Sequence, residues 1–529
     1  MSFTAVKITS DYIVLPVSEF VDSVFVGLKI NDEYVKDVIL RLDYINPTTY
    51  SLLPVSEFKG REVVVEIDAD IEYRNLQTND PTLKKLGENF RPLIHYTADY
   101  GWINDPNGLV KYTSPVTGET VYHLFHQLNP YDWVWGNMHW GHAVSKDLYH
   151  WEHRPIALYP DEMGTMFSGS AVVDKENRSG LKVGDEDVIL LFYTAAGHAC
   201  DVYKVHKFTQ CMAYSVDGGV TFQKYKGNPV VPHIEGANRD PKVVWCEELN
   251  AYVMALYLDK NDFCLLKSDN FIDWEMLQRF TVEGEYECPD FFPALVGNTR
   301  KWVYMGASGK YVLGEFVDGK FVFDPEIKGL YANRQSFAAQ TFSSSDEYER
   351  IQIAWDNTAV FGNATFRGQM SIPYSLSLKE YSDGIRLCAE PYGLDSVRKE
   401  KTEYENIQIK NKSPYKIMLD GSSYELDLEL SASEVCSDVK LNIFGSEIII
   451  KKNASGIVNK EDCLPLDNTA ETVCFKLIVD KGSLEAVSNN GMYMTLSGLM
   501  NYNRNCLVLR TDENECSNLK KLSITKLEL

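Results

Sequence analysis

The chain has 529 residues, which is too long for a single ordinary core and enough for two or three domains. With 52 Lys and Arg against 75 Asp and Glu, its formal net charge is −23, a field that repels phosphate backbones and anionic lipid surfaces. We therefore expect no nucleic-acid and no membrane partner, whereas a neutral ligand meets no such barrier.

The eleven cysteines are scattered along the chain. They form no C-x-x-C pair of the kind that binds zinc or carries redox chemistry, and their number is odd. Free buried thiols in a reducing compartment explain this pattern best. The first residues lack a basic segment followed by an apolar one, and no apolar stretch is long enough to span a bilayer. The expected location is therefore cytoplasmic.

Strand signals dominate the chain, because short runs rich in Val, Ile, Tyr and Phe alternate with Asp, Asn and Gly turns. Residues 1–88 are predicted to form a small β-sandwich-like module, with strands at 12–17, 24–30, 38–42 and 63–67. Residues 400–529 are predicted to form a second β-sandwich, with strands at 424–430, 439–444, 447–450, 474–479 and 506–509. The fold class expected is all-β.

The central region, residues 89–385, carries an internal repeat. A strand, a Ser/Asp turn and an aromatic residue that opens the next strand recur at 143–152, 213–223 and 266–275. The serines of these turns, Ser145, Ser215 and Ser268, are 70 and 53 residues apart. This recurrence favours β-meander blades and hence a β-propeller, with common hairpin turns as the alternative.

Three carboxylates in this region are candidates for glycoside chemistry. Retaining hydrolysis needs one carboxylate to attack the anomeric carbon and one carboxylic acid to protonate the leaving oxygen, about 5–5.5 Å apart. Asp105 lies in Trp-Ile-Asn-Asp-Pro-Asn-Gly, where the flanking Trp and Asn are not required by a turn. Glu287 has apolar neighbours that disfavour its charge and raise its pKa, as a general acid requires.

The residues alone leave alternatives open. Asp105 could be an ordinary Asp-Pro turn residue, and Glu287 could be a solvated carboxylate with Asp290 as its rival. Asp240 follows Arg239, so the pair is either an ion pair within a turn or an anchor for two neighbouring sugar hydroxyls. Seven of the ten histidines lie between residues 95 and 153, and His123/His126 and His139/His142 are spaced i, i+3. On a strand this spacing puts the two rings of a pair on opposite faces, so we expect these histidines to pack or hydrogen-bond rather than bind a metal.

Seven motifs in order resemble glycoside hydrolase family 32, the β-fructofuranosidases that include invertases, exo-inulinases and levanases. The motifs are Trp-Ile-Asn-Asp-Pro-Asn-Gly (102–108), Phe-His-Gln-Leu-Asn-Pro (125–130), Trp-Gly-Asn-Met-His-Trp-Gly-His-Ala (135–143), Phe-Ser-Gly-Ser (167–170), Arg-Asp-Pro-Lys (239–242), Glu-Cys-Pro-Asp (287–290) and Phe-Ala-Ala-Gln-Thr-Phe (337–342). The segment 477–485 is similar to a recurring segment of that family's sandwich domain.

The resemblance implies a five-bladed β-propeller at 89–385, with the active site at its axial funnel, followed by the C-terminal β-sandwich. It implies that Asp105 is the nucleophile, Glu287 the acid/base and Asp240 the stabiliser of the transition state. The residues implied to bind the fructosyl unit are Asn104, Gln127, Trp135, Phe167, Ser168, Arg239 and Trp355. Ile103, His126 and Tyr286 depart from the family's usual residues, which puts sugar fit beyond the fructosyl unit in doubt.

The function expected from the resemblance is retaining, exo-acting release of terminal non-reducing β-D-fructofuranosyl units from fructans, fructo-oligosaccharides and sucrose. No metal or other cofactor is expected. A fructosyltransferase using the same residues and a non-catalytic fructan-binding protein are the alternatives. Linkage preference and oligomeric state remain open.

Overall fold

The structure is a computed structural model. It describes residues 1–82, 91–197, 207–332, 335–343, 348–357, 365–410, 412–452, 463–465, 470–498, 505–511 and 516–529. Across these ranges the regular elements are strands and short 3-10 turns, so the predicted all-β class is confirmed. The 3-10 turns are η1 (Ser56–Phe58), η3 (Glu247–Leu249), η4 (Leu394–Ser396), η5 (Ala432–Glu434) and η6 (Asn489–Gly491). No helix long and apolar enough to cross a lipid bilayer occurs in the described part of the chain.

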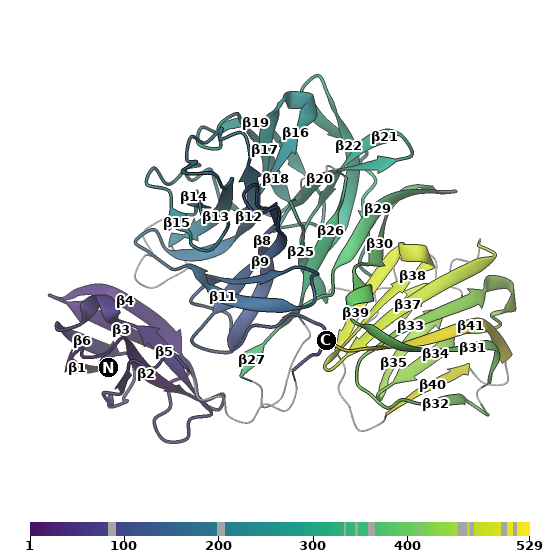
Figure 1. The fold of residues 1–529 in the computed structure, drawn as a ribbon, viewed down its shortest axis with the longest axis horizontal. Helices are drawn as coiled ribbons and strands as arrows, with labels where there is room; N and C mark the ends of the chain where they lie inside the picture. The colour runs from purple at the N-terminus through teal and green to yellow at the C-terminus, as the bar shows by residue number, and fades with distance from the viewer. Residues whose placement is uncertain are drawn as a thin grey trace.

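Two sheets form the N-terminal module (Figure 1). One has the order β1 (Ser2–Lys7), β6 (Glu62–Ile67), β3 (Val24–Ile30) and β4 (Glu33–Leu40), and the other β5 (Thr49–Pro54), β2 (Tyr12–Val17) and β7 (Gln77–Thr78). Alternating side chains of both sheets, such as Val26, Leu28, Leu15 and Leu53, are buried in a shared cluster. Tyr131 and Trp133 of the central region join that cluster, so the module is docked through its own core.

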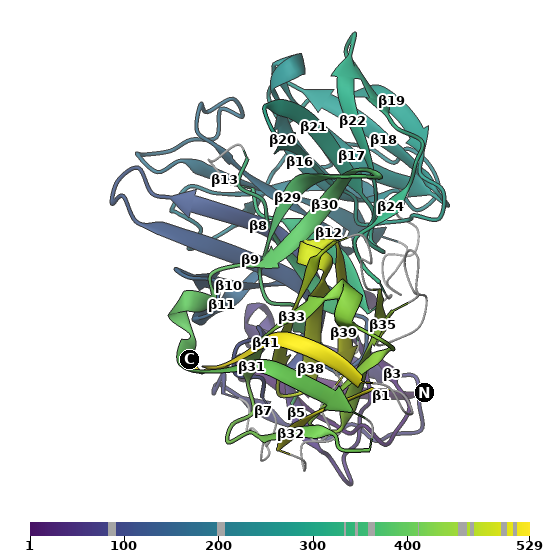
Figure 2. The same ribbon diagram turned by 90° about the vertical axis from the view of Figure 1, so that its right-hand side faces the viewer.

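The central region contains five antiparallel sheets, each built on four consecutive main strands of the described chain (Figures 1 and 2). The first is β8 (Gly101–Thr113), β9 (Thr120–Asn129), β10 (His139–Ser145) and β11 (Trp151–Leu158). The second is β12 (Thr165–Asp174), β13 (Val188–Ala196), β14 (Thr209–Ser215) and β15 (Gln223–Lys224). The third is β16 (Arg239–Cys246), β17 (Ala251–Asp259), β18 (Asp262–Ser268) and β19 (Glu275–Thr281).

The remaining two sheets follow in chain order, and a strand from this part of the chain pairs with the first sheet. The fourth is β20 (Asp290–Val296), β21 (Thr299–Met305), β22 (Lys310–Val317) and β23 (Lys320–Phe323), with β24 (Lys328–Gly329) beside β22. The fifth is β25 (Ser336–Thr341), β26 (Ile351–Asp356), β29 (Tyr374–Tyr381) and β30 (Gly384–Pro391), with β28 (Gln369–Met370) beside β26. Between β26 and β28 in the chain, β27 (Phe366–Arg367) pairs in parallel with β8, so the last part of the region is joined to the first sheet.

The sequence repeat is a turn that recurs at one position in three successive sheets. Ser145, Ser215 and Ser268 end the third strand of the first, second and third sheet. Each serine hydroxyl donates to the side chain two residues on, Asp147, Asp217 or Asn270, and accepts that residue's backbone N–H. The repeat therefore reflects a common hairpin that connects strands three and four of each sheet.

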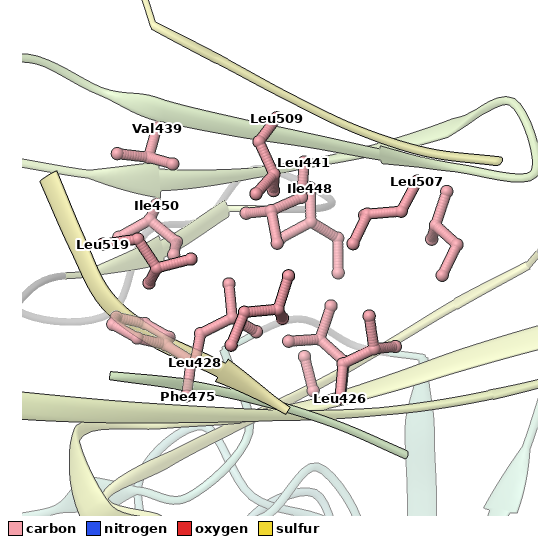
Figure 3. Packing of buried hydrophobic residues seen from close by; sticks show 14 of the residues in the cluster. Leu426, Leu428, Val439, Leu441, Ile448, Ile450, Phe475, Leu507, Leu509 and Leu519 are labelled. Carbon is pink, nitrogen blue, oxygen red and sulfur yellow. The ribbon is translucent and has the colours of Figure 1, made fainter. Parts of the chain in front are cut away.

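The C-terminal region packs a six-stranded sheet against a five-stranded one. The first has the order β31 (Arg398–Lys410), β41 (Cys516–Leu527), β33 (Tyr424–Ser431), β37 (Thr472–Asp480), β38 (Ser483–Ser488) and β39 (Tyr493–Gly498). The second has the order β32 (Tyr415–Met418), β40 (Cys506–Thr511), β34 (Val439–Ile443), β35 (Ser446–Lys451) and β36 (Cys463–Pro465). Leu426, Leu428 and Phe475 of one sheet face Leu441, Ile448 and Leu509 of the other (Figure 3).

The predicted domain boundaries stay predictions. The boundary after residue 88 lies outside the described residues, and the fifth central sheet includes β30, which runs to Pro391. A hydrophobic cluster also continues from the central region into the sandwich, where Tyr374 and Ala389 share buried contacts with Ile478 and Met494. The nine cysteines whose side chains the structure describes are free thiols.

Candidate active site

The candidate carboxylates and their direct neighbours lie at or just before the first strand of the first four central sheets, whereas Gln127 is on β9 and Trp355 on β26. Asp105 is on β8, Ser168 on β12 and Asp240 on β16, whereas Glu287 and Cys288 immediately precede β20. A small cavity of about 10 Å³ is lined from all five sheets, by Pro106, Ser168, Gly169, Asp240, Pro241, Cys288, Ala338 and Gln340. Residues distant in sequence therefore converge because the five first strands meet at one end.

Irregular backbone aims these side chains at the common centre. Strand register shifts at Ile103/Pro106, Phe167/Gly169 and Arg239/Lys242, which are the positions of Asp105, Ser168 and Asp240. Asp240, Glu287 and Cys288 have positive φ angles of 64°, 39° and 42°. Bulges redirect a side chain out of the regular alternation, and left-handed backbone at a non-glycine residue costs energy that the surrounding fold must offset.

Asp105 is held by donors from two other sheets. Ser168 Oγ donates to its Oδ2 at 2.6 Å, and Cys288 Sγ lies 3.5 Å from the same oxygen. Both donors that the described residues offer to this carboxylate bind Oδ2. The other oxygen, Oδ1, is the one left for chemistry.

Arg239 joins the other two carboxylates. Its Nη2 donates to Glu287 Oε2 at 2.7 Å, and its Nε lies 3.5 Å from Asp240 Oδ2. The guanidinium also lies over the Tyr257 ring, 4.5 Å from the centroid, which fixes its plane. The ion pair that was one of the two alternatives for Arg239 and Asp240 is thus extended to Glu287, which precedes the first strand of the next sheet.

Cys288 connects the cluster in a way that the sequence did not reveal. Its backbone N–H donates to Asp240 Oδ2 at 3.0 Å, and its thiol lies 3.5 Å from that oxygen as well as from Asp105 Oδ2. Burial raises the pKa of this thiol well above its usual value, so it stays a neutral donor. In the sequence Cys288 counted only as an apolar neighbour of Glu287, and its place within the Glu-Cys-Pro-Asp motif was the available signal.

The electrostatics of the cluster favour the protonated acids. Burial raises the pKa of Asp240 to about 7, and the Arg239 guanidinium opposes that rise while neighbouring carboxylates add to it. Burial also raises the pKa of Glu287, the hydrogen bond and charge of Arg239 lower it, and the charge of Asp105 raises it. A carboxyl with a raised pKa beside a second carboxylate is the arrangement that general acid catalysis uses.

Asp290, the rival to Glu287, has a different environment. It is fully buried and forms an ion pair with Lys242, whose Nζ lies 2.8 Å from its Oδ1. The backbone N–H and the hydroxyl of Thr341 also donate to this carboxylate, at 2.8 and 3.0 Å. Its hydrogen bonds tie the third, fourth and fifth sheets together, so its role is structural.

The predicted sugar-binding residues fall into two groups. Ser168 and Arg239 contact the carboxylates directly. Asn104 and Gln127 are buried nearby, with the Asn104 side chain accepting from Trp102 Nε1 and the Gln127 amide donating to the Met166 carbonyl. These bonds tie the two amides to Trp102 and to the Met166 carbonyl, and among the described residues neither amide is hydrogen-bonded to a candidate carboxylate.

Aromatic side chains flank these residues. Trp135 is 53% exposed, and its ring stands edge-to-face with Phe167, with 5.8 Å between centroids. Trp355 on β26 packs edge-to-face with Trp102 at 5.8 Å, and its Nε1 is buried without a hydrogen-bond partner among the described residues. Trp102, which the prediction did not include, therefore joins Trp355 to Asn104.

The clustered histidines contact one another and the core. His123 Nδ1 lies 3.0 Å from His142 Nε2, and the Phe125 and His142 rings stack with 4.3 Å between centroids. His126 Nε2 instead lies 2.9 Å from Tyr96 Oη. No group of three or more His, Cys, Asp or Glu side chains is arranged to hold a metal ion within the described ranges.

A carboxyl with a raised pKa, a second carboxylate whose described donors bind one oxygen, and neighbouring aromatic side chains are groups that glycoside chemistry uses. The chain matches "Glycosyl hydrolases family 32 N-terminal domain" over residues 95–391. This protein belongs to glycosyl hydrolases family 32, as the sequence motifs indicated. It is 35% identical over 457 residues to a levanase of Bacillus subtilis (76% of this chain and 65% of the relative) and 36% identical over 321 residues to an invertase of Schizosaccharomyces pombe (55% and 53%).

Solved structures support the same assignment. A β-fructofuranosidase from Schwanniomyces occidentalis complexed with fructosyl-erythritol superposes with a TM-score of 0.71 at 27% identity, over 83% of this chain and 98% of that one. An exo-inulinase from Aspergillus awamori, at 23% identity, shares the fold with a TM-score of 0.70, over 84% and 98%. The chain spans less than two thirds of the length of the levanase and the invertase.

Proposed function

We propose that this protein is a retaining, exo-acting glycoside hydrolase that releases terminal non-reducing β-D-fructofuranosyl units from fructans, fructo-oligosaccharides and sucrose. The observation that carries the proposal is the convergence of Asp105, Asp240 and Glu287 around Arg239 and Cys288. The Schwanniomyces occidentalis enzyme, which shares this fold at 27% identity, was solved with fructosyl-erythritol. The five central sheets are, in this proposal, the blades of a β-propeller whose axis passes through the site.

In the first step Asp105 Oδ1 attacks C2 of the terminal fructosyl unit while the bond from C2 to the leaving oxygen breaks. Glu287, whose pKa is raised by burial, gives its proton to that oxygen. Ser168 and Cys288 hold Oδ2 and so keep Oδ1 in line with the ring. The products of this step are a fructosyl-enzyme ester and a free alcohol.

In the second step water attacks C2, Glu287 takes a proton from it and the ester bond to Asp105 breaks. Asp240, fixed by the backbone N–H of Cys288, hydrogen-bonds to ring hydroxyls as positive charge develops on the fructosyl unit. A sugar hydroxyl in place of water would give a fructosyltransferase instead.

A substrate panel tests the proposal. Purified protein is incubated with sucrose, 1-kestose, inulin and levan, and the products are separated by chromatography at early and late times. From inulin and levan we expect fructose as the only small product at early times, because an exo-acting site releases one unit at a time. Sucrose should give fructose and glucose in equal amounts, and 1-kestose should first give fructose and sucrose. Release of longer fragments from inulin would contradict the exo mode, and accumulation of longer oligosaccharides from concentrated sucrose would favour transfer over hydrolysis. No reaction with any of the four would contradict the proposed activity.

Replacing Arg239 with Gln is expected to move the pH profile of kcat/KM upward as well as to lower its maximum. Arg239 lowers the pKa of Glu287, so its removal raises that pKa further. Glu287 must be protonated in the free enzyme, so the alkaline fall in activity then occurs at higher pH. The loss of the Arg239 charge also raises the pKa of Asp240, so the fall in activity on the acid side of the profile moves to higher pH as well.

The matched control is Arg239→Lys, which keeps the positive charge. We expect it to lose activity because Lys cannot form the same fork of hydrogen bonds, while its profile shifts less than that of Arg239→Gln. The measurement is kcat/KM on sucrose from pH 4 to 9 for all three proteins. Identical pH limbs in the Gln variant and the wild type would show that Arg239 does not set the proton affinity of the acid.

A further inference from the structure

We propose that the N-terminal module builds part of the substrate site: its strand β4 forms one wall of a pocket that holds the saccharide on the leaving side of the scissile bond. The inference rests on the proposed function and names a binding site beyond the fructosyl unit. The pocket has a volume of about 240 Å³. Its walls come from β4 with Ser23 beside it in the module, and from two parts of the central region: the loop between β9 and β10, and the stretch from Tyr159 to Phe167 at the start of β12.

Strand β4 presents a face that does not belong to the module's own core. It is the edge strand of its sheet, and Val38 and Leu40 are buried in the module core. By strand alternation Asp37 and Ile39 lie on the opposite face and line the pocket; Val35, which packs against the module core, borders the pocket as well. Ile39 is 40% exposed, so the face offers free apolar surface.

The opposite wall belongs to the active site. Trp135 and Phe167 line the pocket, and Phe167 directly precedes Ser168, whose hydroxyl holds Asp105. The register of β12 against β13 shifts between Phe167 and Gly169. The Phe167 ring and the Ser168 hydroxyl that contacts Asp105 therefore lie on one bulge. The pocket is therefore continuous with the residues proposed to bind the fructosyl unit.

The module and the loop that carries Trp135 are fixed to each other. The Asn137 side chain donates to the Ile39 carbonyl at 2.7 Å and accepts from the Ile39 N–H at 2.9 Å. Arg41 donates through Nε and its backbone N–H to Asp132, at 3.0 and 2.9 Å. Because both ends of this contact are hydrogen-bonded, the wall is preorganised and a ligand would not have to order it.

The chemistry of the lining suits a saccharide. Trp135 and Tyr159 are 53% and 46% exposed and offer aromatic faces to the apolar face of a sugar ring. Polar groups of Asp37 and Thr165 lie among them, the mixture that small-molecule sites use for orientation.

Thr165 supplies an independent observation. Thr165 is 7% exposed, and its buried hydroxyl has no hydrogen-bond partner among the residues that the structure describes. A buried hydroxyl without a partner is costly, and rotation of this side chain toward the pocket would let it bond to a sugar hydroxyl. The neutral ligand that these groups fit is the part of the fructoside that departs when C2 is attacked.

The test uses two fructosides with the same terminal unit and different leaving groups. Methyl β-D-fructofuranoside has a leaving group too small to fill the pocket, whereas 1-kestose carries a disaccharide there. Ile39→Trp fills the pocket from the module side and keeps the backbone bonds to Asn137. Ile45→Trp is the matched control, because Ile45 is a 79% exposed isoleucine of the same module and is not part of the pocket.

We expect Ile39→Trp to lower kcat/KM on 1-kestose by about tenfold and on methyl β-D-fructofuranoside by less than about twofold. Ile45→Trp should change neither. Thr165→Val should lower kcat/KM on 1-kestose without lowering Tm, because it removes an unpartnered hydroxyl. Equal effects of Ile39→Trp on both substrates, or no effect on either, would overturn the pocket while the activity stands. Failure of the wild-type protein to cleave either fructoside would overturn the proposed function itself.

Discussion

Asp105→Asn is expected to lower kcat on sucrose by at least about 10⁴-fold while leaving the fold unchanged. The amide has the same shape and can still accept the Ser168 hydrogen bond, but it cannot attack C2. The fructosyl-enzyme therefore does not form. The measurement is initial release of fructose, with Tm and circular dichroism recorded on the same samples.

Glu287→Gln separates the two carboxylate roles. It removes the proton donor, so we expect kcat on sucrose to fall by about 10²–10⁴-fold. β-D-Fructofuranosyl fluoride needs little help from an acid, so this variant should still react with it and accumulate a fructosyl-enzyme detectable by intact mass. Asp105→Asn should give no such adduct.

Glu162→Gln is the matched control, since Glu162 is an exposed carboxylate of the same region. Its kcat should equal that of the wild type. A folded Asp105→Asn protein with near-normal kcat would remove the nucleophile assignment, and an adduct formed by Asp105→Asn with the fluoride would require a different nucleophile.

The sequence predicted strands best where the whole run is rich in Val, Ile, Leu and Tyr. The runs 12–17 and 24–30 coincide with β2 and β3, and 424–430 falls within β33. The run 38–42 captured only the end of β4, because Glu33, Tyr34 and Lys36 at its start are polar or exposed. A strand at a sheet edge, with one face turned to a neighbouring region, does not show the apolar pattern of a core strand.

The site was predictable as a set of residue types but not as a geometry. Motif order identified Asp105, Asp240 and Glu287, and the structure brings their side chains to one end of five strands. Cys288 could not be recognised as a donor to two carboxylates, because that contact depends on left-handed backbone at two consecutive residues. Local propensity opposes such backbone, so only the assembled fold shows it.

A second contact beyond the reach of sequence reasoning joins the central region to the sandwich. The segment 477–485 was noticed only as similar to a family segment. In the structure its two carboxylates bind both nitrogens of His95: Asp480 lies 2.9 Å from Nδ1 and Glu485 lies 2.8 Å from Nε2. Nothing local distinguishes these acids from others in the chain.

The His95 triad is completed by backbone donors and is closed to solvent. The N–H groups of Leu93 and Ile94 donate to Asp480, and the Ile372 N–H donates to Glu485, at 3.0, 2.9 and 3.0 Å. The side chains of His95 and Asp480 have no exposed surface. Burial alone would lower the pKa of His95, but the hydrogen bonds that its ring donates to Asp480 and Glu485 outweigh burial and raise the pKa to about 10.

His95→Gln is therefore expected to destabilise the protein by about 3–5 kcal/mol, because it leaves buried carboxylates without their counter-charge. In the wild type, the stabilisation that His95 provides depends on pH. Unfolded His titrates near 6.5 and folded His95 near 10, so the stabilisation is fully present below about pH 6.5 and is lost as pH rises toward 10. The variant lacks this dependence.

The measurement is urea unfolding at pH 6.5 and 9.5 for the wild type, His95→Gln and His150→Gln. His150 is the matched control, because its pair with Asp147 at 2.7 Å is on the surface, with the His side chain 54% exposed. Its loss should change stability by less than about 1 kcal/mol. The difference between wild type and His95→Gln should shrink from pH 6.5 to 9.5. A difference that is constant with pH would mean that His95 acts through packing and hydrogen bonds, and that its charge does not join the sandwich to the central region.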